Sequence, residues 1–292
     1  MEKGAKAMSK RTDRLMRGVF IASATFVSII IFSIILFVGK QGVQTFRDVS
    51  PVEFFFSTDW APLENRYGAL VFILGSFILT GLALLFAVPF AVGGAIFLAK
   101  YAPRWTREIL RPAVDLFVGI PSVVYGLVGL TVFVPWIGKA TGTAGFGVLA
   151  AALILAIMIL PTILSVSEDA LRTISRSLEE GSYALGATRW QTIRLVLLPA
   201  ASPGVLTGII LGMGRAIGEA MAVQMVIGNA PLLPTGPGSP TSVLTTEIVK
   251  DMPNSIFGST VNNALFLMSL VLLLVSLVLI LLIRVIASRR EV

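Results

Sequence analysis

Arg215 and Glu219 are the two charged residues that lie well inside long apolar stretches of this sequence. A charge at the centre of a bilayer costs a few kcal/mol or more, so such residues usually face a pathway or a protein interior. A spacing of four residues puts both on one face of a helix. Arginine offers planar, paired donors that stay charged, which suits an oxyanion. The pair predicts an anion pathway; a structural ion pair, between the two or with a neighbouring helix, is the alternative.

Three glycines spaced four residues apart precede this pair: Gly204, Gly208 and Gly212. Such a stripe of small residues lets two membrane helices pack closely. Arg215 and Glu219 follow Gly208 and Gly212 by seven residues, which is about two helical turns along the same side. Both charges are therefore predicted to point into the protein, away from lipid.

The composition excludes a soluble globular protein. Of the 292 residues, 55% are hydrophobic and only 13% are charged, and the mean hydropathy is +0.89, well to the apolar side of soluble domains. The absence of Cys and His excludes disulfides, thiol nucleophiles, most zinc and haem sites and histidine acid–base chemistry. No metal site is expected.

Six apolar stretches are long enough to cross a bilayer, which takes about 20 helical residues. They lie near 19–38, 69–99, 116–137, 146–164, 204–227 and 261–283. The sequence therefore predicts an all-α membrane protein with six transmembrane helices, preceded by a basic cytoplasmic segment at 1–18. Two outer loops follow, 39–68 and 228–260, the second with a short helix near 242–250.

Basic residues set the predicted orientation. Of the 23 Lys and Arg residues, 17 fall in the segments that lie inside if the N-terminus is inside, against five outside. This bias predicts that both termini are cytoplasmic. It also disfavours nucleic-acid binding as the reason for the net charge of +7, because these charges flank helix ends and lack the interleaved aromatic residues of a nucleic-acid-binding face.

The inner segment 165–198 is polar but carries helix signals. Ser177 with Glu180 and Thr188 with Gln191 have the spacing of capping boxes, and Gly186 between them can end a helix in the left-handed conformation. Two short helices with a sharp turn are predicted. Such a pair suits insertion into a cleft of a partner; an amphipathic helix lying on the membrane surface is the alternative.

The same segment resembles a known loop. Glu180-Gly181-Ser182, then Gly186, then Val196-x-Leu198-Pro199 is similar to the EAA-x3-G-x9-I-x-LP loop of bacterial ABC importer permeases, with Gly and Ser in place of the two Ala. The resemblance implies that Glu180, Gly186 and Pro199 belong to a coupling helix that docks on a nucleotide-binding subunit.

Three further segments narrow the resemblance: GIPSVVYG at 119–126, TDWAP at 58–62 with Tyr67-Gly68-Ala69, and GRAIGEAMAV at 214–223. Together they resemble the C-type permease subunit of the phosphate-specific ABC importer. This implies the type I (MetI-like) permease fold and a phosphate pathway at Arg215 and Glu219. Ser122, Tyr125 and Gln224 are candidates for lining that pathway; hydrogen bonding between helices is the alternative for Ser122 and Tyr125.

The chain contains no GxxxxGK[ST] motif, so it has no P-loop of its own. The resemblance implies that ATP and Mg bind to two partner ATPase subunits, that an A-type permease forms the other half of the pore, and that an extracytoplasmic phosphate-binding protein delivers substrate. The expected location is the bacterial cytoplasmic membrane. The alternatives are the sister A-type subunit, a related oxyanion permease, an anion channel, a membrane-embedded enzyme and a scaffold.

Glu219 is harder to explain, because a carboxylate repels an anion. One hypothesis is that Glu219 tempers the charge of Arg215 so that phosphate is not trapped. A second is that it accepts a hydrogen bond from a protonated phosphate oxygen, which sulfate lacks.

Overall fold

The computed structural model describes residues 2–288, with side chains for residues 15–281 and 283–285. Within that part, six helical stretches are long and apolar enough to cross a membrane: Leu15–Arg47, Leu70–Tyr101, Ser122–Thr141, Val148–Thr173, Arg189–Gly218 and Thr260–Val285. The prediction of an all-α protein with six spans is confirmed. Arg289 and Arg290, which the orientation prediction counts, lie outside the described residues.

The elements follow one another along the chain as helices with one small hairpin. The first half contains α1 (Glu2–Val43), η1 (Gln44–Arg47), α2 (Pro51–Phe56), β1 (Trp60–Ala61), η2 (Pro62–Glu64), β2 (Arg66–Tyr67), α3 (Leu70–Ile96), η3 (Phe97–Tyr101), α4 (Arg104–Gly119), α5 (Ser122–Val128), η4 (Gly129–Phe133) and α6 (Val134–Thr141). The second half contains α7 (Val148–Thr173), α8 (Arg176–Ala184), α9 (Arg189–Thr192), η5 (Ile193–Leu197), α10 (Leu198–Gly218), α11 (Met221–Gln224), α12 (Leu244–Asp251), η6 (Met252–Asn254) and α13 (Thr260–Ser288).

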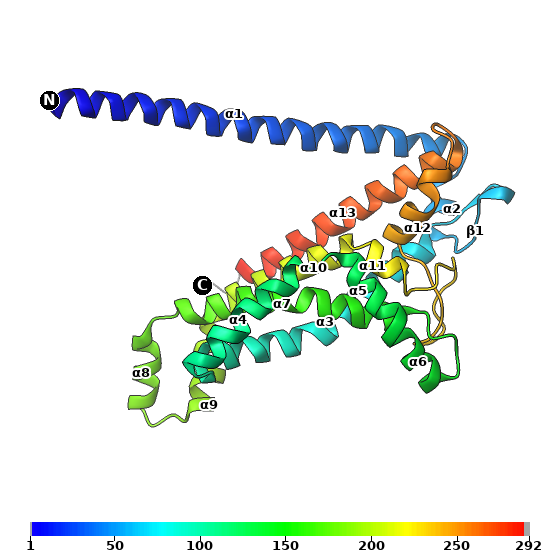
Figure 1. The fold of residues 1–292 in the computed structure, drawn as a ribbon. Helices are drawn as coiled ribbons and strands as arrows, with labels where there is room; N and C mark the ends of the chain where they lie inside the picture. Colours follow the sequence, from blue (N-terminus) through cyan, green and yellow to red (C-terminus); the bar gives the residue numbers. More distant parts are fainter. Residues whose placement is uncertain (1, 289–292) are drawn as a thin grey trace.

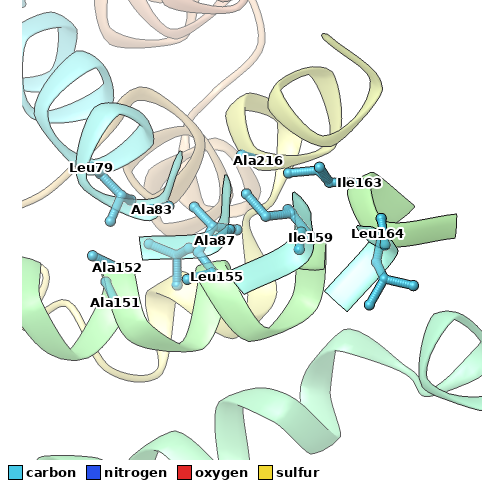
Figure 2. Close-up of a cluster of buried hydrophobic side chains, with 14 of the residues drawn as sticks. Leu79, Ala83, Ala87, Ala151, Ala152, Leu155, Ile159, Ile163, Leu164 and Ala216 are labelled. Atoms are coloured by element: carbon cyan, nitrogen blue, oxygen red, sulfur yellow. The ribbon is translucent and has the colours of Figure 1, made fainter. Parts of the chain in front are cut away.

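The core is formed where α3, α7 and α10 pack together (Figure 1). Alanines spaced four residues apart on α3, such as Ala83 and Ala87, are fully or almost fully buried. Figure 2 shows them facing α7 residues that include Leu155 and Ile159. Small side chains on one helix let the second helix approach closely, which in a membrane replaces the hydrophobic effect as the source of packing energy.

The first helix stands apart from this core. In Figure 1, the C-terminal end of α1 meets α13, and the rest of α1 points away from the bundle. Gly42 permits the contact, because a Cβ there would lie 2.9 Å from the Leu267 backbone. The apolar window of the first span contains no buried residue, so its surface is left for lipid or for another subunit.

The predicted outer loops form a second, smaller cluster. Trp60 of β1 pairs with Tyr67 of β2 in an antiparallel hairpin, and its ring meets that of Phe72 on α3 edge to face, with 5.4 Å between ring centroids. Arg66 closes the hairpin by pairing with Asp59 and Glu64. The short helix predicted near 242–250 is confirmed as α12, which packs on α13.

The third span begins later than predicted. The helix is interrupted between α4 and α5, where the backbone of Ile120 is extended with ψ 130°. Ile120 precedes Pro121, and a proline clashes with a helical conformation at the residue before it. The expected 116–137 span therefore becomes Ser122–Thr141. Residues 116–119 instead belong to the strongly amphipathic α4.

The fourth span extends nine residues beyond the predicted end at 164, to Thr173. Polar residues beyond Leu164 suggested an end there, but Glu168 is 1% exposed and pairs with Arg172 at 3.1 Å and with Arg111 of α4 at 3.9 Å. Paired charges let the helix continue with a polar face. The segment between regular helical spans is accordingly 174–188, shorter than the predicted 165–198.

The fifth span is displaced toward the N-terminus of its predicted range. Its helical path starts at Arg189 and ends at Gly218, whereas 204–227 was expected. Pro199 lies in the first turn of α10, directly after the π-helical η5, and a π-turn is one of the adjustments that accommodate a proline in a membrane helix. The residues beyond Gly218 form α11 and a turn.

Candidate functional site

Arg215 lies in the last turn of α10, half-buried. Its Nη1 donates a hydrogen bond to Thr162 Oγ1 on α7, with 3.4 Å between the two atoms. Within the described part of the chain, no carboxylate lies within ion-pair distance of Arg215. The described residues therefore do not support the alternative that Arg215 serves a structural ion pair.

Glu219 is the C-cap residue of α10, so it directly follows the last helical turn, which carries Arg215. The backbone at Glu219 is extended, with ψ 126°, and α10 ends one residue earlier. The Glu219 carboxylate accepts a hydrogen bond from the Ala222 N–H at 3.1 Å, and the Glu219 carbonyl accepts one from the Thr245 hydroxyl at 2.9 Å. Both bonds satisfy backbone groups that a helix end exposes, which stabilises the break.

The glycine stripe is confirmed as the contact between α10 and α7. A Cβ on Gly204 would lie 2.3 Å from the Ala170 Cβ, and one on Gly212 would lie 2.6 Å from the Ile163 side chain. At Gly204 no larger residue fits without movement of a helix, because the opposing atom is a Cβ; at Gly212 the Ile163 side chain would have to shift. The close packing fixes the register of the two helices and thereby brings Arg215 next to Thr162.

The GIPSVVYG segment packs on α11, just beyond Glu219. A Cβ on Gly126 would lie 3.0 Å from the Ala222 Cα, and Tyr125 is buried beside Ala222. The Tyr125 hydroxyl donates to the Phe117 carbonyl at 2.7 Å, across the break between α4 and α5. This bond is structural and lies within one segment rather than between two spans. Ser122 and Gln224 are half-buried and remain candidates for lining.

The inner segment forms a hairpin that protrudes from one end of the bundle, with α8 and α9 as its two arms (Figure 1). The capping box of Thr188 and Gln191 is confirmed. The one predicted at Ser177 is wrong: Ser175 is the cap, and its hydroxyl accepts from the Ser177 N–H, because the extended residues 174–175 place the turn earlier. Gly186 has φ +82°, the left-handed conformation that was predicted.

The hairpin is anchored to η3, which continues α3 at its C-terminal end. Lys100 pairs with Glu179 at 2.7 Å, and the Arg189 guanidinium lies 5.1 Å from the centre of the Tyr101 ring. Lys100 holds the pKa of the Glu179 carboxyl below its ordinary value, so this pair stays charged through neutral pH. Among the described residues, the neighbouring Glu180 makes no ion pair or hydrogen bond through its side chain and is exposed. One glutamate therefore fixes the hairpin, and the other is available to a partner.

The tip of the hairpin is apolar. Leu185, next to Gly186, is 90% exposed, and Trp190 at the start of α9 is 55% exposed. An exposed leucine and tryptophan at a protruding turn are typical of a protein-contact surface. Pro199 is also exposed, but it lies in the first turn of α10, at the base of the hairpin rather than at its tip.

The outer helix α12 contains a buried carboxylate that the sequence analysis missed. Glu247 is 0% exposed, and one of its oxygens accepts a hydrogen bond from Lys250 at 2.9 Å. Its Oε2 is buried with no hydrogen-bond partner in the described part of the chain. Burial raises the pKa of Glu247 from 4.5 to about 7. Its position in a polar outer loop gave no signal that it would be buried.

This raised pKa predicts a pH-dependent stability. Between pH 4.5 and about 7, folded Glu247 keeps a proton that the unfolded chain has released, so stability falls as pH rises through that range. We expect Glu247→Gln, which stays neutral, to gain thermal stability relative to the wild type between pH 5 and pH 8. Thermal unfolding at both pH values checks this. Glu108→Gln, at an exposed glutamate of α4, serves as the control, and an equal Glu247→Gln effect at both pH values would contradict it.

Three comparisons place the chain among known proteins. A family model described as "Binding-protein-dependent transport system inner membrane component" matches residues 91–292. The probable ABC transporter permease protein YqgH of Bacillus subtilis is 49% identical over 303 residues, covering 100% of this chain and 98% of the relative. The phosphate transport system permease protein PstC of Xylella fastidiosa is 34% identical, covering 98% of this chain and 94% of the relative. PstC of Haemophilus influenzae is 35% identical over 82% of this chain and 81% of the relative.

Among solved structures, a chain of a bacterial alginate ABC transporter matches with a TM-score of 0.65 at 20% identity, covering 95% of this chain and 96% of that one. A chain of the MetNI methionine ABC transporter matches with a TM-score of 0.53 at 20% identity, covering 79% of this chain and 97% of that one. At this level of identity the likeness concerns the fold, and the predicted MetI-like permease fold is confirmed.

Proposed function

Because the chain belongs to the family of binding-protein-dependent transport system inner membrane components, we propose that it is the C-type permease subunit of an ATP-driven phosphate importer. PstC relatives over most of the chain support the substrate. The observation that carries the proposal is the Arg215 guanidinium, half-buried at the end of a membrane span and not neutralised by a carboxylate of the described chain. A tetrahedral oxyanion supplies the charge and the acceptors that this group lacks.

The hairpin formed by α8 and α9 is proposed to couple ATP hydrolysis to movement of Arg215. ATP and Mg bind to two ATPase subunits, and Glu180, Leu185 and Trp190 face the groove of one of them. One continuous helical path runs from Arg189 to Gly218, about 45 Å at 1.5 Å per residue. Movement of the hairpin is therefore transmitted along a single rod to Arg215, which is exposed to one side of the membrane and then to the other.

The remaining partners follow from the uncovered surfaces. An A-type permease subunit is proposed to cover the face that holds Arg215 and Thr162, completing the pathway between the two halves. A phosphate-binding protein is proposed to dock on the cluster around the β1–β2 hairpin and α12. Since six spans put both ends of the chain on one side, and the basic residues favour the inside, both termini are proposed to be cytoplasmic in a bacterial inner membrane.

Reconstituted vesicles test the proposal. The chain is co-purified with its A-type partner and ATPase, and radioactive phosphate uptake is measured with and without ATP and the binding protein. We expect uptake only when both are present. Phosphate flux without ATP would indicate an anion channel, and ATP-driven uptake of sulfate instead of phosphate would indicate a related oxyanion permease. Either result would overturn the proposal.

Gly186 provides a prediction for the coupling hairpin. Valine at φ +82° is strained by roughly 1–2 kcal/mol, so Gly186→Val distorts the turn that carries Leu185. We expect the variant to insert into the membrane normally but to lose most of its ATPase subunit on purification and most of its transport-coupled ATP hydrolysis.

The matched control is Gly181→Ala. A Cβ at Gly181 meets nothing within 4 Å and the backbone has an ordinary φ, so this variant should retain the ATPase. Full retention of the ATPase by Gly186→Val would contradict the assignment of this turn to docking.

A further inference from the structure

Thr162 does not make the hydrogen bond that five other hydroxyl side chains of the membrane helices make. Ser28, Ser76, Thr131, Thr207 and Ser269 each donate to the carbonyl four residues earlier, the usual way in which a helical hydroxyl satisfies its proton. In the described part of the chain, Thr162 Oγ1 takes part in a single hydrogen bond, as the acceptor from Arg215. A hydroxyl has one donor and two acceptor sites, so its proton is free for another acceptor.

The position of Thr162 is set by rigid packing. The next residue, Ile163, is fully buried and packs against two glycines of α10. A Cβ on Gly212 would lie 2.6 Å from the Ile163 side chain, and a Cβ on Gly208 would lie 3.2 Å from the Ile163 carbonyl oxygen. Pro161 directly precedes Thr162, and the proline ring fixes the backbone φ of residue 161. Thr162 is therefore held beside Arg215 by its neighbours, while its own side chain is only half-buried.

Thr162 also suits the charge of the site. A carboxylate in this position would neutralise Arg215 and oppose an anion, whereas a hydroxyl orients the guanidinium without changing its charge. One oxygen of the Glu219 carboxylate accepts from the Ala222 N–H, and in the described part of the chain Glu219 forms no ion pair with Arg215. The guanidinium has five N–H donors, of which Thr162 takes one, so the others and the threonine proton remain for oxygens of one bound anion.

We propose that Thr162 is a substrate-contacting residue that donates its hydroxyl proton to an oxygen of the oxyanion held by Arg215. This rests on the proposed function, because it assigns a second contact within the same pathway. Arg215 supplies the charge and a paired set of donors, and Thr162 supplies a neutral donor from the facing helix. A tetrahedral anion with several acceptor oxygens can use both at once.

The first test is transport by the full complex in vesicles at saturating phosphate, ATP and binding protein. We expect Thr162→Val to lower the uptake rate about tenfold or more, the usual effect of losing one hydrogen bond to a charged group, and Thr162→Ser to restore most of it. Thr207→Val is the matched control, because that hydroxyl is satisfied by the Pro203 carbonyl, and it should transport normally. Wild-type rates in Thr162→Val would overturn the inference.

The second test is independent of transport activity. The chain contains no cysteine, so Thr162→Cys introduces a single thiol into this subunit. We expect a small anionic methanethiosulfonate to label it, phosphate to slow the labelling, and chloride to have no effect. Thr207→Cys should be labelled at a rate that phosphate does not change.

A thiol at Thr162→Cys that is inert, or that reacts equally with and without phosphate, would show that the residue is off the pathway and would overturn the inference. Failure of the proposed function is a separate outcome: there, the wild-type complex itself fails to import phosphate. If the wild type imports phosphate and the Thr162 variants do not differ from it, the proposed function stands and the assignment of Thr162 falls.

Discussion

Replacing Arg215 with alanine is expected to reduce phosphate uptake by the assembled importer about a hundredfold or more. The variant loses a paired set of charge-assisted donors, each worth roughly 1.5–3 kcal/mol when the anion is desolvated. Assembly should survive, because the only hydrogen bond that the Arg215 side chain makes within the described chain is to Thr162 at 3.4 Å. The uptake rate, normalised to the amount of intact complex, is the measurement.

Arg215→Lys separates charge from geometry. Lysine keeps the positive charge but lacks the planar fork that binds two oxygens at once, so an intermediate rate is expected. Arg17→Ala, at an exposed arginine on α1, should leave uptake unchanged. A wild-type rate in Arg215→Ala would remove this residue from the pathway.

The second large effect is expected at Gly204, where alanine should destabilise the subunit by about 1–3 kcal/mol, the usual cost of overpacking. The added Cβ would lie 2.3 Å from the Ala170 Cβ, much closer than two carbon atoms can approach, so α10 and α7 must separate. Uptake should fall as well, because Arg215 and Thr162 meet across the same contact. The rate of thermal inactivation of the purified complex measures the first effect, and vesicle uptake measures the second.

A second substitution tests the cause. Ala170→Gly removes the opposing Cβ and should restore much of the stability of Gly204→Ala, a non-additivity expected of residues in contact. Gly214→Ala on the same helix is the control, because its Cβ would meet only the end of the Ile280 side chain at 3.9 Å. If Ala170→Gly gives no rescue, close packing at this position is not the reason for the glycine.

The break after Gly218 changes the interpretation of Glu219. The Glu219 carboxylate caps α11 by accepting from the Ala222 N–H, and the Glu219 carbonyl accepts from the Thr245 hydroxyl. Glu219 therefore joins the end of the fifth span to α12. The hypotheses that Glu219 tempers the charge of Arg215, or accepts a hydrogen bond from a protonated phosphate oxygen, stay predictions; among the described residues the two side chains form no ion pair. Its carboxylate remains close to the pathway in sequence, but its observed bonds are structural.

The number of spans and the hairpin formed by α8 and α9 were predictable because their causes are local. A run of apolar residues crosses a bilayer whatever its neighbours are, the cap of Thr188 and Gln191 needs only four residues, and Gly186 adopts its left-handed φ within a single turn. The glycine stripe was also readable, since its spacing of four defines a face before the partner helix is known.

Span boundaries were less predictable where charges are buried. Glu168 ended the predicted fourth span, yet it is paired with Arg111 and Arg172 from two helices. Nothing in the local sequence indicates that Arg111, 57 residues earlier, lies beside it. The same holds for Glu247, whose burial comes from packing against other elements.

The sequence by itself determined that this is a six-span membrane protein, with a left-handed turn at Gly186 and a charged residue in a span at Arg215, because hydropathy, capping and glycine conformation act over a few residues. Only the tertiary structure decided what surrounds that charge. The fifth span ends at Gly218 and the Glu219 carboxylate bonds to the Ala222 N–H beyond it, while close glycine packing brings Thr162 to Arg215 from a helix 53 residues away in the chain. Contacts between distant residues depend on how helices pack, and spacing along one helix does not encode them.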